Sequence, residues 1–255
     1  MIDTHAHLND EDLIDRAEEI LQDPWLETVI VPGYDYESSA RAVSLAKKYD
    51  KVYACVGCHP HDAERFSGEE KEYYRLSATN PKVVAIGEIG LDYYRDLSPR
   101  DVQKRVFEEQ IALAYDVGLP IVLHVRDAYG DTLEILKNNS EKLKNGVLLH
   151  CYSGSAEMVR EFSAFDAYFA FGGAVTYKGA KRDDAIRAVQ EDRLLLETDC
   201  PYMTPTPMRG KVRENEPSYI RYTLEFVSGV LGKTADEVER ITTENAKRFF
   251  AKIKA

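Results

Sequence analysis

The segment 121–150 begins with Ile121-Val122-Leu123-His124 and ends with Val147-Leu148-Leu149-His150. Both runs are apolar up to a closing histidine. Apolar runs without polar alternation are typical of parallel strands that are buried on both faces. The two histidines are separated by roughly one strand, one helix and two short connections, ~26 residues. The segment therefore predicts a strand–helix–strand unit with a histidine at the end of each strand.

The same kind of run occurs eight times in the chain. The other six are Ile2-Asp3-Thr4-His5-Ala6-His7, Thr28-Val29-Ile30-Val31, Val52-Tyr53-Ala54-Cys55-Val56-Gly57, Val83-Val84-Ala85-Ile86-Gly87-Glu88, Tyr168-Phe169-Ala170-Phe171 and Leu194-Leu195-Leu196-Glu197-Thr198-Asp199. From His7 to Asp199 the repeats average roughly 27 residues, the length of a strand and a helix with two connections. Eight such units predict an α/β fold, a (β/α)8 TIM barrel. A doubly wound open sheet is the alternative.

Two helices carry clear terminal signals. Apolar residues recur along one face between Asp101 and Val117, with Pro99 in position for the first helical turn and Gly118 for the C-terminal exit. Thr234 and Glu237 have the spacing of a capping box, which predicts a helix near the C-terminus.

Composition predicts one domain over residues 1–255. The chain has 44% hydrophobic residues, shows no linker, and has no apolar run that approaches membrane-spanning length. Its first residues lack the features of a secretion signal. The four cysteines, at positions 55, 58, 151 and 200, are therefore expected to be reduced thiols in the cytoplasm.

The net charge of −11 excludes one mode of nucleic-acid binding. Non-specific coating of a duplex depends on many lysine and arginine contacts to phosphates, which an acidic surface does not provide. A local basic pocket remains compatible with this charge, because an active site needs to hold only one or two phosphates.

All six histidines stand at or just after the ends of apolar runs: His5, His7, His59, His61, His124 and His150. Residues two apart on a strand point to the same side, so the imidazoles of His5 and His7 are able to reach one ion. A hydrogen-bonded pair is the alternative for an isolated His-x-His. The position of this pair in the first apolar run favours the metal site.

Glu88 and Asp199 end two further runs, and together with the histidines they form a ring of metal-ligand types. In barrels the carboxyl ends of the strands carry the active site. A glutamate is able to bridge two cations about 3.5–4 Å apart, as in two-metal hydrolases. We therefore expect His5, His7 and Asp199 at one divalent cation, His124 and His150 at a second, and Glu88 between them.

Six ordered blocks of the sequence resemble those of TatD-family metal-dependent deoxyribonucleases, barrel enzymes of the amidohydrolase-like superfamily. They are Asp3-Thr-His-Ala-His7, Gly57-Cys-His-Pro-His61, Ile86-Gly-Glu-Ile-Gly-Leu-Asp-Tyr93, His124-Val-Arg-Asp-Ala128, His150-Cys-Tyr-Ser-Gly-Ser155 and Leu195-Leu-Glu-Thr-Asp-Cys-Pro-Tyr202. The resemblance extends from Met1 to Thr243-Glu-Asn-Ala246 and covers nearly the whole chain.

The resemblance implies that the six positions already chosen bind divalent metal and that the protein hydrolyses phosphodiester bonds in DNA, as a 3′–5′ exonuclease. We expect Asp199 and Glu88 to be catalytic, with Asp199 orienting the attacking water and taking its proton. Nitrogen and carboxylate ligands suit zinc, manganese, iron or cobalt, and magnesium is a further candidate.

Four residues are candidates for contact with substrate. His59 and His61 project toward the same rim as the metal ligands, and a structural role is the alternative for each. Arg126 follows His124 by two residues and offers a guanidinium fork for phosphate. Arg209 lies in a basic loop after the eighth run, for which a solvated loop is the alternative. Tyr93, Tyr94 and Tyr202 are positioned to stack on nucleobases or to pack.

Two other classes of function remain open. The same two-metal barrel is able to hydrolyse carboxylic esters, including an aminoacyl ester on tRNA, because activated water attacks carbon as well as phosphorus. A non-catalytic metal-binding protein is the third class. DNA is the expected partner, and neither a membrane nor an obligate protein partner is expected.

Overall fold

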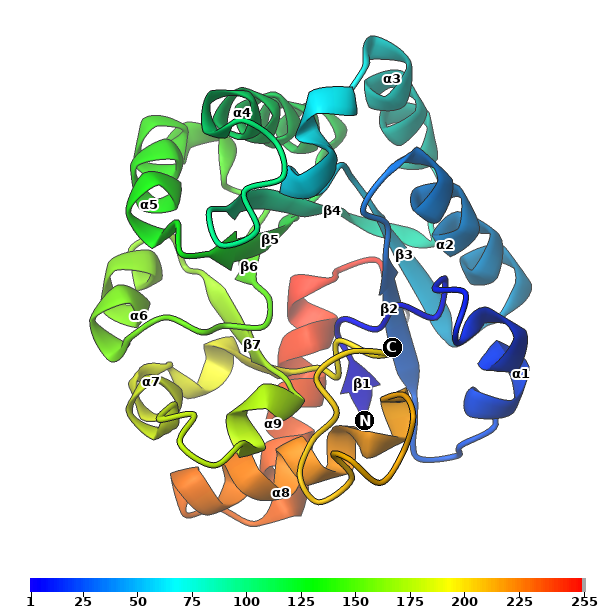
Figure 1. Ribbon diagram of the computed structural model, residues 1–255, viewed down its shortest axis with the longest axis vertical. Coiled ribbons are helices and arrows are strands. Elements are labelled where there is room, and N and C mark those ends of the chain that lie inside the picture. Colours follow the sequence, from blue (N-terminus) through cyan, green and yellow to red (C-terminus); the bar gives the residue numbers. More distant parts are fainter. Residues whose placement is uncertain (254–255) are drawn as a thin grey trace.

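Eight parallel strands form a barrel in the computed structural model, which describes residues 1–253 (Figure 1). The strands are β1 (Ile2–Asp3), β2 (Thr28–Pro32), β3 (Val52–Val56), β4 (Val83–Asp92), β5 (Ile121–Arg126), β6 (Val147–Leu149), β7 (Tyr168–Phe171) and β8 (Leu194–Leu196). They are ordered in space as in sequence. Just beyond the strands, Thr4 N–H donates to the Leu196 carbonyl (3.2 Å) and Asp199 N–H to the His5 carbonyl (2.9 Å), which joins the first strand to the last.

Helices surround this barrel (Figure 1). They are α1 (Ala17–Ile20), α2 (Tyr36–Lys48), α3 (Gly68–Ser77), α4 (Arg100–Val117), α5 (Tyr129–Asn138), α6 (Ala156–Ser163), α7 (Asp183–Ala188), α8 (Ile220–Leu231) and α9 (Ala235–Phe249). Short 3-10 helices cover Ile14–Arg16, Pro60–Arg65, Ser140–Lys142, Gly173–Thr176, Glu191–Arg193 and Pro217–Tyr219. The barrel predicted from the eight runs is confirmed, and the open-sheet alternative is wrong.

The terminal signals of two helices work as expected, with one difference. Gly118 ends α4 with φ +71°, a left-handed conformation that glycine adopts without steric cost. Pro99 is the residue before the helix rather than part of its first turn. Thr234 and Glu237 form the capping box of α9, because each side chain accepts a hydrogen bond from the other's backbone N–H.

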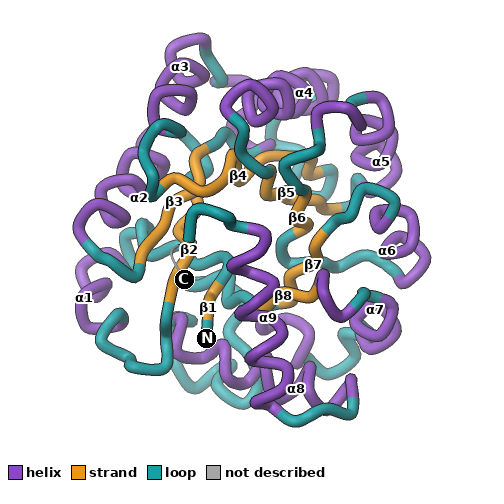
Figure 2. The backbone as a smooth tube through the Cα atoms, turned by 180° about the vertical axis from the view of Figure 1, so that it is seen from behind, coloured by secondary structure: helices purple, strands orange, loops and turns teal. Residues whose placement is uncertain are grey.

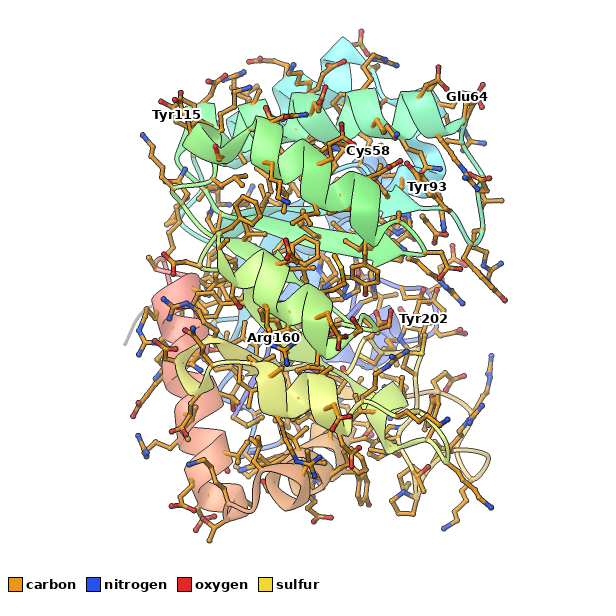
Figure 3. All side chains as sticks on the ribbon, turned by 90° about the vertical axis from the view of Figure 1, so that its left-hand side faces the viewer. Cys58, Glu64, Tyr93, Tyr115, Arg160 and Tyr202 are labelled. Atoms are coloured by element: carbon orange, nitrogen blue, oxygen red, sulfur yellow. The ribbon has the colours of Figure 1, made fainter. Side chains whose placement is uncertain are left out.

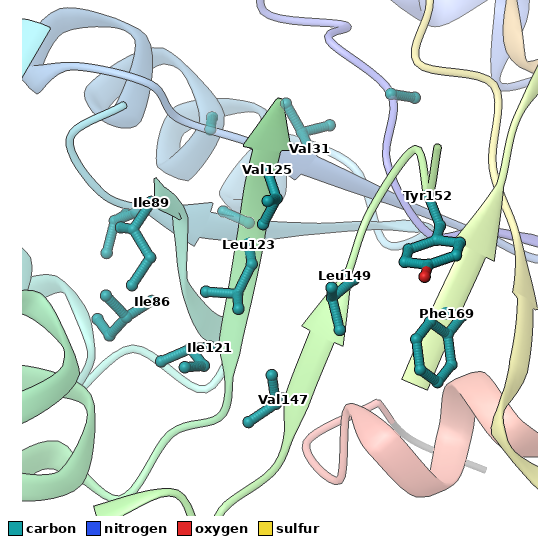
Figure 4. Close-up of a cluster of buried hydrophobic side chains, with 14 of the residues drawn as sticks. Val31, Ile86, Ile89, Ile121, Leu123, Val125, Val147, Leu149, Tyr152 and Phe169 are labelled. Atoms are coloured by element: carbon teal, nitrogen blue, oxygen red, sulfur yellow. The ribbon is translucent and has the colours of Figure 1, made fainter. Parts of the chain in front are cut away.

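The core has two layers, and strand alternation decides which residues belong to each. Ile121, Leu123 and Val125 point outward and pack between the sheet and the helices (Figure 4). Val122 points into the barrel interior with its counterparts from the other strands. Because side chains alternate along a strand, His124 and Arg126 continue the interior side of β5 toward its carboxyl end.

The opposite end of the barrel is covered by α9 (Figure 2). Phe249, Phe250 and Ile253 are buried and belong to the interior cluster. This end is therefore filled with apolar side chains, whereas the carboxyl ends of the strands open into a polar cavity. Within residues 1–253, the helices include none that is long and apolar enough to span a membrane.

Candidate metal centre and substrate cavity

His5 and His7 lie just past β1, on the same side of the chain, as their spacing predicts. Their Nε2 atoms are 3.3 Å apart, and both imidazoles are buried. Asp199 follows β8, and its Oδ1 lies 3.5 Å from His7 Nε2 and 3.8 Å from His5 Nε2. Asp199 has φ +55°, a strained conformation for a non-glycine residue, of the kind found at functional sites. Three ligand atoms thus converge from the two strands that close the barrel.

Glu88 lies at a bulge of β4. The pairing with β5 advances from Ile86–Ile121 to Ile89–Leu123, so β4 has one extra residue here. Such bulges re-aim side chains next to active sites. Gly90 follows the bulge and has φ +137°. It lies so close to β5 that a Cβ there would collide with the His124 carbonyl oxygen. The local sequence Gly-Glu-Ile-Gly therefore serves to place one carboxylate.

The two oxygens of Glu88 face two different groups of histidines. Oε2 lies 3.5 Å from His5 Nε2 and 3.9 Å from His7 Nε2. Oε1 lies 2.9 Å from His124 Nδ1 and 2.8 Å from His150 Nε2. The carboxylate thus spans the two sets of ligands that the sequence analysis separated.

Two buried carboxylates stand behind the second set of histidines, and neither was predicted from the sequence to belong to the site. Asp92 Oδ2 lies 3.0 Å from His124 Nε2, on the far side of the ring from Glu88. Glu197 Oε1 lies 3.5 Å from His150 Nδ1 and accepts a 2.6 Å hydrogen bond from the Cys151 N–H. Carboxylates in this position fix the orientation of metal-binding imidazoles and raise their basicity.

A third buried carboxylate, Asp3, ties the first strand to the last. It accepts hydrogen bonds from the His5 N–H (3.2 Å), the Thr198 N–H (3.0 Å) and the Thr198 hydroxyl (2.6 Å). Thr198 precedes Asp199, so Asp3 fixes the backbone on both sides of the first ligand set. In the sequence, the one feature that could have indicated these buried carboxylates is the unusual occurrence of acidic residues inside apolar runs.

His59 and His61 lie beyond β3, at the start of the 3-10 helix Pro60–Arg65, rather than on the strand. His59 Nδ1 accepts a hydrogen bond from the His61 N–H (3.1 Å), so the proton of the neutral ring is on Nε2, which faces Glu88 Oε1 at 3.5 Å. His61 Nε2 is 2.9 Å from Asp92 Oδ2. His59, His61 and His124 are close enough to form a third ligand group. Because His59 Nδ1 and His61 Nε2 already have these hydrogen-bond partners, we assign His59 and His61 a hydrogen-bonding role and keep His124 with the second ligand set.

The electrostatics of the site keep the carboxylates of Glu88 and Asp199 ionised, whereas burial raises the pKa of Asp3 to about 8. Burial opposes ionisation of Glu88, but the electrostatic interaction with His150 and hydrogen bonds from the histidines hold its pKa well below the usual value. Burial likewise opposes ionisation of Asp199, and the hydrogen bond from His7 keeps its pKa low. Burial lowers the pKa of His59 to about 3, so this ring is neutral at pH 7. Negative oxygens therefore face the imidazole nitrogens across the site.

The donor set fits divalent cations. The ligand atoms of His5, His7 and Asp199 lie within 4.8 Å of one another, and so do those of His5, Glu88 and His150. All five residues are buried. Buried carboxylates and imidazoles at such spacing are the ligands that zinc-class ions prefer.

A cavity of about 910 Å³ opens above this cluster. Nine of the ten residues proposed from sequence line it, namely His7, His59, His61, Glu88, His124, Arg126, His150, Asp199 and Arg209, and His5 lies beneath them. Tyr93 and Tyr202, from the loops after β4 and β8, lie toward this same end of the barrel (Figure 3). Tyr202 also lines the cavity, whereas Tyr93 bonds to Asp131 away from it.

Comparison with known proteins shows the family of this chain. The family model described as TatD related DNase matches residues 2–251. The chain belongs to this family. It is 44% identical over 254 residues to the metal-dependent hydrolase YabD of Bacillus subtilis, with 98% of each chain covered. It is 36% identical to the 3′-5′ ssDNA/RNA exonuclease TatD of Cronobacter sakazakii, with 88% of this chain and 86% of that protein covered.

A solved structure extends the comparison to the fold. The TatD homologue YJJV of Escherichia coli K12 superposes with a TM-score of 0.92 at 30% identity, and 98% of each chain is covered. The TatD-family resemblance of the six sequence blocks is thereby confirmed. The protein is a metal-dependent hydrolase of the TatD family.

Proposed function

We propose that this TatD-family protein is a 3′–5′ exonuclease that hydrolyses phosphodiester bonds of single-stranded nucleic acid with two bound divalent cations. The observation that carries the proposal is the position of Glu88, whose two oxygens face separate histidine sets at the base of an open cavity. The exonuclease TatD relatives, at 36% identity, supply the substrate class. DNA is the expected substrate, and RNA shares the same scissile group.

The proposed ligands are His5, His7 and Asp199 for one cation and His124 and His150 for the other, with Glu88 shared. When bound, the cations would acidify a water molecule and polarise the phosphoryl oxygen. Asp199 borders the cavity and is ionised, so it orients the attacking water and accepts its proton. Asp92 and Glu197 hold the imidazoles of His124 and His150 in place.

Residues around the cations bind the substrate. His59 donates a hydrogen bond through Nε2 to a phosphoryl oxygen, because its other nitrogen is occupied and the ring is neutral. Arg126 and Arg209 line the cavity and bind phosphate. His61 contacts the substrate at the cavity wall and is held by Asp92. Water adds to phosphorus, one ester bond breaks, and its oxygen leaves with a proton from solvent.

The test is hydrolysis of end-labelled single-stranded DNA, single-stranded RNA and duplex DNA by metal-stripped protein that is reconstituted with Mg²⁺, Mn²⁺ or Zn²⁺. We expect a ladder that shortens from the 3′ end of single strands only when a cation is present. Glu88→Ala is the control for contaminating nuclease. An aminoacyl-tRNA and a simple carboxylic ester are assayed in parallel. Hydrolysis of esters without hydrolysis of any phosphodiester would replace the nuclease with the esterase alternative.

A cytoplasmic location is part of the same proposal, since exposed single strands and reduced thiols occur there. Fractionation of cells from the source organism, with immunodetection of the protein, checks it.

A further inference from the structure

Two groups of positively charged side chains lie on the rim of the cavity, although the chain as a whole carries a net charge of −11. Arg95 follows β4 and Arg126 ends β5, and we call them the first cation group. Lys178 and Arg182 follow β7 and Arg209 follows β8, and these form the second cation group. The barrel order places the loop after β6 between the groups on one side, and β1, β2 and β3 between them on the other.

These five side chains form no ion pair in the part of the chain that the structure describes. Their neighbours outside the cavity do: Arg100 pairs with Asp96 at 2.9 Å, and Arg213 pairs with Glu214 at 2.6 Å. Arginine and lysine side chains that remain unpaired on an acidic protein produce a local positive potential, which attracts anionic ligands.

One arginine of each group is held by a tyrosine. The Arg126 guanidinium carbon lies 3.8 Å from the ring centroid of Tyr94, and that of Arg209 lies 4.0 Å from the ring centroid of Tyr177. A guanidinium stacked on an aromatic ring keeps its in-plane N–H groups free for phosphate. Tyr94 is 61% exposed, which leaves ring surface for a nucleobase. Each group thus combines a guanidinium that is able to bind a phosphate with an aromatic ring on which a nucleobase is able to stack.

We propose that the nucleic-acid strand crosses the cavity between the two cation groups, with one flanking phosphate held on each side of the bond that is cut. This inference rests on the proposed phosphodiesterase function and adds a substrate class to it. If a 3′–5′ exonuclease held a phosphate only on the 5′ side of the bond that is cut, a phosphate on the terminal 3′ oxygen would not increase its affinity for the strand. With the second site present, a strand that ends in a 3′-phosphate is bound more tightly than one that ends in a hydroxyl.

Four thymidine dinucleotides isolate the two sites, because they share one scissile bond and differ only in terminal phosphates: TpT, pTpT, TpTp and pTpTp. For the wild-type holoenzyme we expect kcat/KM to rise about 5- to 20-fold with each terminal phosphate, as a screened charge-assisted contact would give. Arg126→Ala should abolish the gain from one terminal phosphate, and Arg209→Ala the gain from the other. Arg213→Ala, in the same loop as Arg209 but paired with Glu214, is the matched control and should retain both gains.

The inference would be overturned if both variants lost the gain from the same terminal phosphate, or if neither variant lost a gain. The proposed nuclease function would stand in both cases. If the wild type hydrolyses none of the four compounds although it binds metal, the proposed function itself fails. The strand path is then tested by fluorescence anisotropy with a 5′-labelled thymidine octamer. Weaker binding by each of the Arg126 and Arg209 variants, but not by Arg213→Ala, supports it, and unchanged binding overturns it.

Discussion

His59 is the residue whose proposed role rests most clearly on a single hydrogen bond. Its Nδ1 accepts from the His61 N–H, so the neutral ring presents an N–H to the cavity rather than a lone pair. We predict that His59→Ala lowers kcat by about 100-fold, the usual effect of removing one donor to a developing anion, without loss of bound metal. Turnover and elemental analysis of the same preparation check this. Loss of one metal equivalent would make His59 a ligand instead.

Asp92 contacts His124, one of the proposed ligands, at 3.0 Å and is proposed to act through it. We predict that Asp92→Asn weakens metal affinity by roughly 10- to 100-fold, as for other carboxylates behind a ligating histidine. The amide is able to preserve the hydrogen bonds that Asp92 Oδ1 accepts from the Tyr94 and Arg95 N–H groups, so the loop should remain folded. Competition titration with a chelating dye measures the affinity. Asp96→Asn, an exposed residue of the same loop, is the control, and an equal loss there would refute the assignment.

At the scale of elements, Asp131 connects α5 to two neighbours. Its Oδ2 is 2.6 Å from Lys104 Nζ on α4 and 2.6 Å from the Tyr93 hydroxyl after β4. The Lys104 and Tyr93 hydrogen bonds hold the pKa of Asp131 below the value of the unfolded chain. The carboxylate therefore stabilises the folded protein above the unfolded pKa, and this contribution is lost as pH falls through the folded pKa.

We accordingly predict that Asp131→Asn lowers the free energy of unfolding at pH 7 by only about 0.5 kcal/mol, because the pair is half exposed. The difference between wild type and variant should disappear as pH falls below the usual range of aspartate ionisation. Urea unfolding at pH 7 and at pH 3 measures it. A difference that grows on acidification would mean that the folded protein raises the pKa of Asp131 instead of lowering it.

The elements also show what the sequence could predict. The apolar runs alone predict that His124 and His150 stand at the carboxyl ends of β5 and β6. That both continue the interior side of their strands follows only from the structure, in which Val122 and Leu148 belong to the interior cluster. The partners Asp92, Glu197 and Asp3 could not be assigned in the same way. A carboxylate at the end of a strand gains its meaning only when barrel closure brings an imidazole or a hydroxyl from another strand beside it. The bulge at Glu88 was equally invisible, because it depends on register with β5.

At the scale of the whole molecule, the proposed ligands lie at the ends of β1, β4, β5, β6 and β8, so bound cations would connect strands that are distant in sequence. A ligand that binds only the folded state stabilises it by mass action. We predict that chelation lowers the melting temperature of the protein and that reconstitution restores it, with one cooperative transition in both states if residues 1–255 form a single domain. Differential scanning calorimetry tests both points. An unchanged melting temperature would mean that the cations do not bind preferentially to the folded protein, which contradicts a site built by barrel closure.

We propose above all that Glu88 joins two cation sites at the open end of this barrel. The most direct measurement is the number of tightly bound divalent cations per chain, by mass spectrometry of metals after dialysis, together with single-stranded DNA hydrolysis at increasing metal equivalents. We expect two cations per wild-type chain, hydrolysis that reaches its maximum only near two equivalents, and loss of both features in Glu88→Ala. Full hydrolysis with one cation, or two cations retained by Glu88→Ala, would contradict it.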